Sequence, residues 1–214
     1  MARKRVAVLI SGRGSNMAAL IEAAKDKNYP AEIVLVISNR PNAGGIAYAR
    51  DAGIATTIVD HTDYGKNREA FEHALQNVLE GSGIDIVCLA GFMRLFTPWF
   101  PNKWQGRMLN IHPALLPAFP GLHTHEQALA AGAKTHGATV HFVTVEMDAG
   151  PIVCQAAVPV LDGDTAETLG ARVLAVEHKI YPLALKWVAE GKVRVTDGKC
   201  IIDNAHAPDG VTVP

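Results

Sequence analysis

The feature that most constrains the fold is an alternation of short apolar runs, rich in β-branched residues, with segments of helical periodicity. The runs have the length of buried strands and lie at residues 6–10, 33–38, 56–59, 84–89 and 108–111. The helical segments lie at 16–27, 43–52, 68–79 and 125–131. Because right-handed crossovers through helices join parallel strands, this order predicts an α/β fold. We expect a Rossmann-like, doubly wound, mostly parallel sheet with helices on both faces, and ligands at the carboxyl ends of its strands.

The second half of the chain changes in pattern but shows no linker or internal repeat. Further strands are expected at residues 138–142 and 153–160. Asp164 followed by Glu167 predicts a capping box that opens a helix to about residue 190, kinked or interrupted at Pro182. Residues 192–196 and 199–202 around Asp197-Gly198 predict a hairpin. We therefore expect one domain over residues 1–214.

Composition excludes several classes of function. A chain of 214 residues that is 49% hydrophobic has the composition of a globular protein. Its net charge of −1 provides no basic field for a nucleic acid, and no apolar run approaches the length of a membrane span. Three widely spaced cysteines, an odd number without metal-site spacing, favour a reducing cytoplasm.

A glycine-rich loop follows the first expected strand and leads into the first expected helix. It reads Ser11-Gly12-Arg13-Gly14-Ser15-Asn16. Glycine allows a tight turn, and the unpaired N–H groups of a helix start attract anions, so the loop predicts a phosphate site. A dinucleotide site is disfavoured, because Met17 replaces the third glycine and Ser38-Asn39-Arg40 offers no acid for a ribose. The alternative is a turn that binds no ligand.

Polar residues end the fifth expected strand. Asn110 and His112 alternate with apolar neighbours, so both face one side, and Pro113 ends the strand. An amide and an imidazole at this position can donate hydrogen bonds to a developing oxyanion. The alternative is structural, with Asn110 bonded to local backbone and His112 an interior histidine.

A third feature lies beyond the next expected strand. Asp148 precedes Gly150-Pro151 in a loop one βα unit after His112, so both side chains can reach one crevice. A carboxylate beside an imidazole favours the imidazolium form. The alternative is a solvated turn aspartate. His123 and His125 lack a third ligand at metal-site spacing, so we expect no metal.

These features belong to a longer series of ordered motifs. The series comprises residues 9–16, Leu89-Ala90-Gly91-Phe92-Met93-Arg94, 109–117, Pro120-Gly121-Leu122-His123-Thr124-His125, His136-Gly137, 140–143, Asp148 with Gly150-Pro151, and 177–182. With this series the chain resembles the phosphoribosylglycinamide formyltransferases, also called glycinamide ribonucleotide transformylases, of the folate-dependent formyltransferase family. The resemblance covers nearly the whole chain and implies the formyltransferase fold.

The resemblance also implies an activity, which is transfer of the formyl group of 10-formyltetrahydrofolate to the amine of 5-phosphoribosylglycinamide in purine biosynthesis. Its catalytic residues would be Asn110, His112 and Asp148, with His141 just behind them. Residues for the ribonucleotide would be Gly14, Ser15, Asn16, Leu174, Ala175, Val176 and Glu177. Residues for the folate would be Arg68, Met93, Arg94, Leu95, Phe96, Asn110, Thr144, Val145, Glu146, Met147 and Asp148. The enzyme would be a monomer or homodimer, with a mobile loop at residues 118–127.

In this chemistry the amine attacks the formyl carbon directly. Asn110 and a protonated His112 would stabilise the tetrahedral oxyanion, and Asp148 would assist. Two other functions fit the same residues: hydrolysis, as in a formyltetrahydrofolate deformylase, and phosphate or nucleotide binding without catalysis. The relatives that act on tRNA or deformylate folate carry an additional domain, for which we expect no room in 214 residues.

Overall fold

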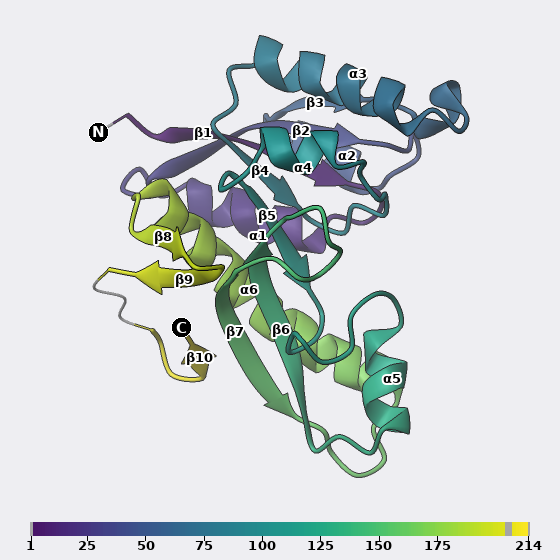
Figure 1. Ribbon diagram of the computed structural model, residues 1–214, viewed down its shortest axis with the longest axis vertical. Helices are drawn as coiled ribbons and strands as arrows, with labels where there is room; N and C mark the ends of the chain where they lie inside the picture. The colour runs from purple at the N-terminus through teal and green to yellow at the C-terminus, as the bar shows by residue number, and fades with distance from the viewer. Residues whose placement is uncertain (1, 204–206, 214) are drawn as a thin grey trace. The chain divides into compact units, whose positions relative to one another are not determined.

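The chain divides into two compact units in a computed structural model that describes residues 2–203 and 207–213. The units are Met1–Leu109 and Asn110–Pro214 (Figure 1). The single domain expected over residues 1–214 stays a prediction. None of the described helices combines the length and the apolar composition that a membrane span requires.

The first unit is built on a parallel sheet. Its strands are β1 (Lys4–Ile10), β2 (Ala31–Ser38), β3 (Ala55–Ile58) and β4 (Ile86–Leu89), in the order β4-β1-β2-β3. All three ladders between these neighbours are parallel. The residues of β1 from Val6 to Ile10 are fully buried, as expected for a central strand covered on both faces. The prediction of parallel βα units is confirmed here.

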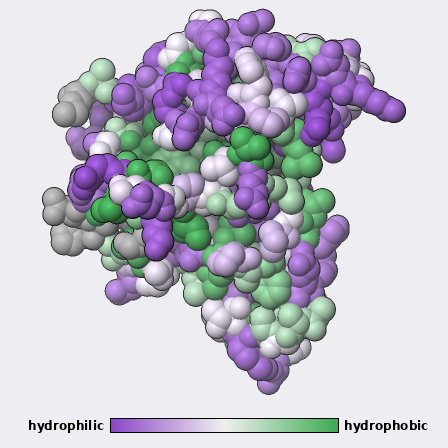
Figure 2. All heavy atoms as spheres, viewed as in Figure 1, coloured by the Kyte–Doolittle hydropathy of each residue, from purple (hydrophilic) through white to green (hydrophobic). Residues whose placement is uncertain are grey.

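The connections of the first unit are mostly helical. They are α1 (Ser15–Ala24), α2 (Gly45–Asp51), the 3₁₀ helix η1 (His61–Tyr64), α3 (Arg68–Gly81) and α4 (Trp99–Lys103). Helix α3 buries Phe71, Leu75 and Leu79 at helical spacing, and hydrophilic side chains cover its outer face (Figure 2). It also buries the carboxylate of Glu72, which breaks this apolar pattern.

The second unit is mainly antiparallel. Its strands follow the order β10-β7-β6-β5, with β5 (Met108–His112), β6 (Thr135–Phe142), β7 (Ile152–Pro159) and β10 (Val211–Thr212). Strand β7 is antiparallel to both β6 and β10. Its helices are α5 (Thr124–Ala130) and α6 (Ala166–Ala189), and β8 (Val193–Thr196) pairs with β9 (Lys199–Ile202). The predicted hairpin is confirmed, and the positive φ of both Asp197 and Gly198 suits its tight turn.

The predicted start of the long helix is wrong by one residue. Thr165, not Asp164, is the N-cap of α6, and it forms a reciprocal capping box with Thr168. The Asp164 carboxylate is occupied elsewhere, since it accepts hydrogen bonds from Arg172 and from the N–H of Leu161. These contacts hold the pKa of Asp164 well below its usual range.

The structure also bears on the expectation at Pro182. Helix α6 continues through Pro182, so the helix is not interrupted there, and a kink at this residue stays a prediction. The short elements η1, α4 and β10 were not expected, because each has fewer residues than a periodic pattern needs to show. Most other elements begin or end a few residues away from the predicted positions, as is usual at frayed ends.

Candidate active site

The predicted phosphate loop turns at Gly14 and leads directly into α1. Gly14 is the N-cap of this helix, in the left-handed conformation with φ 72°, and no side chain caps the helix start. A β-carbon at Gly14 would lie 3.0 Å from Met17 Cε and 3.3 Å from Gly45 Cα. Gly45 in turn donates its N–H to the Gly12 carbonyl over 3.0 Å. The loop is thus held by close packing against Met17 and Gly45. Because no side chain caps α1, the backbone N–H groups at its start can bind an anion.

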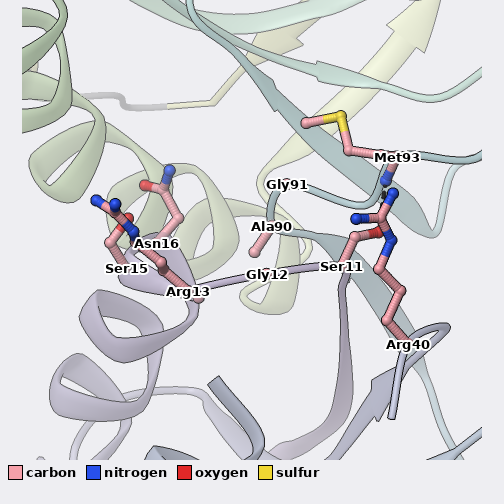
Figure 3. A pocket seen from close by; sticks show the side chains of 10 residues that line it. Ser11, Gly12, Arg13, Ser15, Asn16, Arg40, Ala90, Gly91 and Met93 are labelled. Carbon is pink, nitrogen blue, oxygen red and sulfur yellow. Dashed lines mark hydrogen bonds between the residues drawn. The ribbon is translucent and has the colours of Figure 1, made fainter. Parts of the chain in front are cut away.

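A pocket of about 340 Å³ opens at this loop. Its lining combines the whole loop with residues after β2 and β4, namely Ser11, Gly12, Arg13, Gly14, Ser15, Asn16, Arg40, Ala90, Gly91 and Met93. Arg13 lies on the side with Ser15 and Asn16, while Arg40 lies on the side with Ser11 and Met93 (Figure 3). Two guanidinium groups and no carboxylate line the pocket, so its charge favours an anion.

The predicted catalytic residues lie together in the second unit. Asn110 and His112 stand at the end of β5, and Asp148 lies in the loop between β6 and β7. His112 Nδ1 is 3.6 Å from Asp148 Oδ2, and the His112 side chain is almost fully buried. The expected pairing of imidazole and carboxylate is therefore present in the fold.

Both nitrogens of His112 face oxygen acceptors. Nε2 is 2.9 Å from the Phe119 carbonyl, and Nδ1 faces Asp148. A carbonyl can only accept, so Nε2 carries a proton in this arrangement. Nδ1 forms an ion pair with the Asp148 carboxylate only when this nitrogen is protonated as well.

A second buried imidazole lies behind these groups. His141 Nδ1 is 2.9 Å from the Phe142 carbonyl, so this nitrogen is the donor. Nε2 then accepts from the Asn110 amide over 3.2 Å, and it is 3.9 Å from Asp148 Oδ1. Burial lowers the pKa of His141, which keeps the ring neutral. One N–H of the Asn110 amide is thereby used, and the other meets no hydrogen-bond acceptor in the part of the chain that the structure describes, so it can donate to a ligand.

A β-bulge sets the position of His141. The register between β6 and β7 shifts after Val140, so that Val140 pairs with Cys154 but His141 pairs with Ile152. Bulges of this kind re-aim side chains and are frequent near active sites.

Asp148 is held in an uncommon backbone conformation. Its φ is 54°, in the left-handed region, and its Oδ2 accepts the N–H of Gly121 over 2.9 Å. Two residues later, a β-carbon at Gly150 would lie 1.8 Å from the Phe142 carbonyl oxygen, so only glycine fits there. The same carbonyl accepts from His141, which links the Asp148 loop to the tautomer of that ring.

Comparison with known proteins identifies the family. Residues 4–185 match the formyl transferase family. The chain belongs to this family. A relative from Escherichia coli named phosphoribosylglycinamide formyltransferase is 44% identical over 203 residues, covering 95% of each chain. Relatives from Bos taurus, Homo sapiens and Gallus gallus, named trifunctional purine biosynthetic protein adenosine-3, are 54%, 53% and 50% identical, but this chain spans only 19% of their length.

Solved structures confirm the predicted formyltransferase fold. Glycinamide ribonucleotide transformylase 1 from Symbiobacterium toebii superposes with a TM-score of 0.91 at 46% identity, covering 94% of both chains. A formyltetrahydrofolate deformylase from Pseudomonas syringae pv. tomato reaches a TM-score of 0.87 at 28% identity, covering 94% of this chain and 66% of that chain. The fold alone therefore does not separate transfer from hydrolysis.

The remaining predicted binding residues of this formyl transferase fall in both units. In the first unit, Arg68 begins α3, and segment 93–96 follows β4 with Met93 and Leu95 exposed. In the second unit, Leu174, Ala175, Val176 and Glu177 form one turn of α6, of which Glu177 is buried. Thr144 donates to the Glu146 carbonyl, and Val145 and Met147 are exposed in the same loop. The roles of these residues stay predictions.

Sequence reasoning missed several groups that contact the predicted site residues of this formyl transferase or the residues next to them. The Phe119 carbonyl and the Gly121 N–H are backbone groups, which no side-chain pattern reveals. Ser11 was expected only as part of the glycine-rich loop, but its hydroxyl accepts the N–H of Met93. Glu72 could have been found, since an acid on the buried face of a predicted helix is unusual.

Proposed function

We propose that this formyl transferase moves the formyl group of 10-formyltetrahydrofolate to the amine of 5-phosphoribosylglycinamide, a reaction of purine biosynthesis. The observation that carries the proposal is the buried pair of His112 and Asp148 beside an Asn110 amide that His141 orients. The names of the relatives and of the similar solved structures support the choice of substrates.

The reaction begins when the amine lone pair attacks the formyl carbon. The carbon–oxygen double bond becomes a single bond, so its oxygen gains a negative charge while the amine nitrogen becomes positive. The free N–H of Asn110 and an N–H of protonated His112 donate to this oxygen. Loss of one such donor typically reduces the rate by about 100-fold or more.

The intermediate then collapses toward the products. The bond from the formyl carbon to folate N10 breaks, its electron pair stays on nitrogen, and the carbonyl forms again. The amine loses a proton, which Asp148 accepts through water, and N10 gains one. The products are formylated ribonucleotide and tetrahydrofolate, and no covalent enzyme intermediate is formed.

The neighbouring loop must move for His112 to act. Its Nε2 donates to the Phe119 carbonyl, and the adjoining Gly121 N–H donates to Asp148. Both contacts occupy groups that the reaction needs, so we propose that residues 119–121 withdraw when the substrates bind. This agrees with the mobile loop expected at residues 118–127.

The proposed binding roles follow the charge and exposure of each segment. Gly14, Ser15 and Asn16 hold the substrate phosphate in the cationic pocket, and Glu177 with its α6 neighbours binds the remainder of the ribonucleotide. Segment 93–96 and Arg68 in the first unit, and the loop 144–148 in the second, contact the folate. Arg94 Nε is buried without a partner among the described residues, which suits a donor that meets a ligand.

The proposal also covers the cellular location, the oligomeric state and the need for a metal. The three cysteines are buried and form no disulfide among the described residues, which suits a reducing cytoplasm. Monomer and homodimer both stay predictions. The reaction as written requires no metal.

A turnover assay tests the proposal. The protein is mixed with 10-formyltetrahydrofolate, with and without 5-phosphoribosylglycinamide, and tetrahydrofolate and formylated ribonucleotide are both measured. We expect the two products in equal amounts and only with both substrates present. Equal folate consumption without the ribonucleotide would establish a deformylase instead, and phosphate binding without any consumption would leave only a binding protein.

A further inference from the structure

Segment 93–97, which follows β4 in the first unit, exposes apolar side chains in an unusual way. Met93 is 58% exposed and Leu95 is 61% exposed, whereas Phe92 is buried. Phe96 points the other way, since it stacks on Phe92 and Phe100 with ring centroids 5.6 and 4.6 Å apart. The segment therefore packs one set of side chains inward and presents the other set outward, as a ligand-binding edge does.

The first end of this segment is held by a buried hydroxyl. Ser11 Oγ accepts the N–H of Met93 over 2.7 Å (Figure 3) and donates to Asn39 Oδ1 over 2.6 Å. A hydroxyl has a single proton, so the bond to Asn39 directs its lone pairs toward Met93. Asn39 is fully buried, and His61 Nδ1 lies 2.8 Å from its backbone carbonyl oxygen and 3.2 Å from its side-chain Nδ2.

The bond between the Ser11 hydroxyl and Asn39 also explains why a polar residue is buried directly after β2. The sequence Ser38-Asn39-Arg40 carries no acid for a ribose, and its polar residues Ser38 and Asn39 are both fully buried. The Asn39 amide is the acceptor that fixes the direction of the Ser11 hydroxyl. A buried amide with this partner rigidifies its surroundings.

The other end of the segment is held by a buried carboxylate. Glu72 lies on α3 with no exposed surface. Its Oε1 accepts the N–H of Thr97 and its Oε2 accepts the Thr97 hydroxyl, each over 2.6 Å. Both hydrogen bonds are short, so this two-point contact fixes both the backbone and the side chain of Thr97.

We propose that Ser11 and Glu72 are positioning residues, which hold the two ends of segment 93–97 so that Met93 and Leu95 present a fixed apolar edge to the folate co-substrate. This inference rests on the proposed function, because that function supplies the ligand. Neither residue needs to touch the folate. Their effect is to remove the cost of ordering the segment when the folate binds.

The Glu72 contact gives the cleaner test, because Ser11 also lines the phosphate pocket. Thr97→Val keeps the shape of the side chain but removes the hydroxyl that bonds to Glu72. Thr97→Ser keeps the hydroxyl and is the matched control. We expect Thr97→Val to raise the KM for 10-formyltetrahydrofolate about tenfold, with kcat and the KM for the ribonucleotide within about twofold of wild type.

The control separates positioning from simple destabilisation. Thr97→Ser should return the folate KM to within about twofold of wild type. Thermal unfolding of both variants is measured in parallel, since a purely structural contact would lower stability and leave the folate KM unchanged. An unchanged folate KM in Thr97→Val, or an equal rise for both substrates, would overturn the inference.

A direct binding measurement distinguishes this inference from the proposed function. Calorimetric titration with tetrahydrofolate alone should show about tenfold weaker binding to Thr97→Val than to wild type, and near-wild-type binding to Thr97→Ser. This holds even if the wild-type protein transfers no formyl group. If wild type transfers no formyl group but Thr97→Val still binds tetrahydrofolate more weakly than wild type and Thr97→Ser do, the proposed function alone is refuted. If wild type is active but Thr97→Val binds tetrahydrofolate as tightly as wild type does, the positioning role alone is refuted.

Discussion

The orientation of Asn110 by His141 leads to a prediction that the structure makes quantitative. In His141→Phe the ring volume is largely kept, but the acceptor for the Asn110 amide is lost. That acceptor lies 3.2 Å from Asn110 Nδ2, and His141 itself is fixed by its donation to the Phe142 carbonyl. Without it the Asn110 amide can rotate about its side-chain bonds, so its free N–H no longer has one direction.

The size of the effect follows from the role of that N–H. Complete loss of an oxyanion donor costs about 100-fold to 1,000-fold in kcat. Asn110 is still present in His141→Phe, so we expect a smaller loss of about 10-fold to 100-fold, or roughly 1.4–2.7 kcal/mol of transition-state stabilisation. The KM values should change by less than about threefold, because the lost interaction belongs to the transition state. The unpaired Phe142 carbonyl should lower the free energy of unfolding by about 1–3 kcal/mol.

His141→Gln is the matched control. Its side-chain oxygen reaches about as far as Nε2 and can accept from Asn110. We expect it to recover most of the kcat that His141→Phe loses, as measured by steady-state kinetics at saturating substrates. Equal kcat in wild type and His141→Phe, or equal loss in both variants, would refute the orienting role.

The pH dependence of kcat provides a second measurement on the same variants. Burial lowers the pKa of His141 below its ordinary value of 6.5, so the neutral, accepting form persists at pH values above that lowered pKa. Protonation at lower pH turns Nε2 into a donor, which repels the Asn110 amide. As the pH falls, the kcat of wild type should therefore decrease through protonation of His141, and the kcat of His141→Gln should not show this decrease. Identical acid limbs in the two proteins would contradict this.

The remaining predictions concern the carboxylate, a close backbone contact and a buried histidine. Asp148→Asn keeps the side-chain shape but loses the charge that faces His112, so kcat should fall at least about 100-fold. The free energy of unfolding should change by less than about 1 kcal/mol, and wild-type kinetics in this variant would exclude the proposed role of Asp148. In Gly150→Ala the new β-carbon would press on the Phe142 carbonyl, so the free energy of unfolding in urea should fall by about 1–3 kcal/mol and kcat should fall as well. An unchanged urea midpoint would show that the contact is absent. Burial lowers the pKa of His136 to about 4, so its neutral form stabilises the fold above pH 6.5 and this contribution is lost as the pH falls toward 4. His136→Gln should accordingly show a smaller drop in urea midpoint than wild type between pH 7 and 4.5, and parallel drops would refute the assignment.

The parallel strands could be predicted because their signal is local. Runs such as Val6 to Ile10 are continuous in β-branched and aliphatic residues, and the burial of every one of them is what such a run indicates. The start of α6 could not be assigned as reliably. Asp164 and Thr165 are both good N-cap residues, and the choice between them depends on Arg172, which reaches Asp164 only after the helix has formed.

The closeness of three candidate side chains could be predicted. Asn110 and His112 follow from alternation at a strand end, and their closeness to Asp148 follows from the expected sheet. The contacts that control these groups could not be predicted. They come from a register shift after Val140 and from the Phe119 carbonyl, and neither leaves a mark in the sequence.

The two imidazoles near Asp148 show why these contacts matter. Asp148 lies 3.6 Å from a nitrogen of His112 and 3.9 Å from a nitrogen of His141, so its charge alone does not distinguish them. The other hydrogen-bond partners of the two rings distinguish His112 from His141. His141 has an amide donor at Nε2, which only an unprotonated nitrogen can accept, whereas His112 has a carbonyl acceptor at Nε2, which requires a proton there. The same carboxylate therefore lies beside one ring whose partner requires an unprotonated Nε2 and beside another whose partner requires a protonated Nε2, and this difference comes from the group that each Nε2 meets.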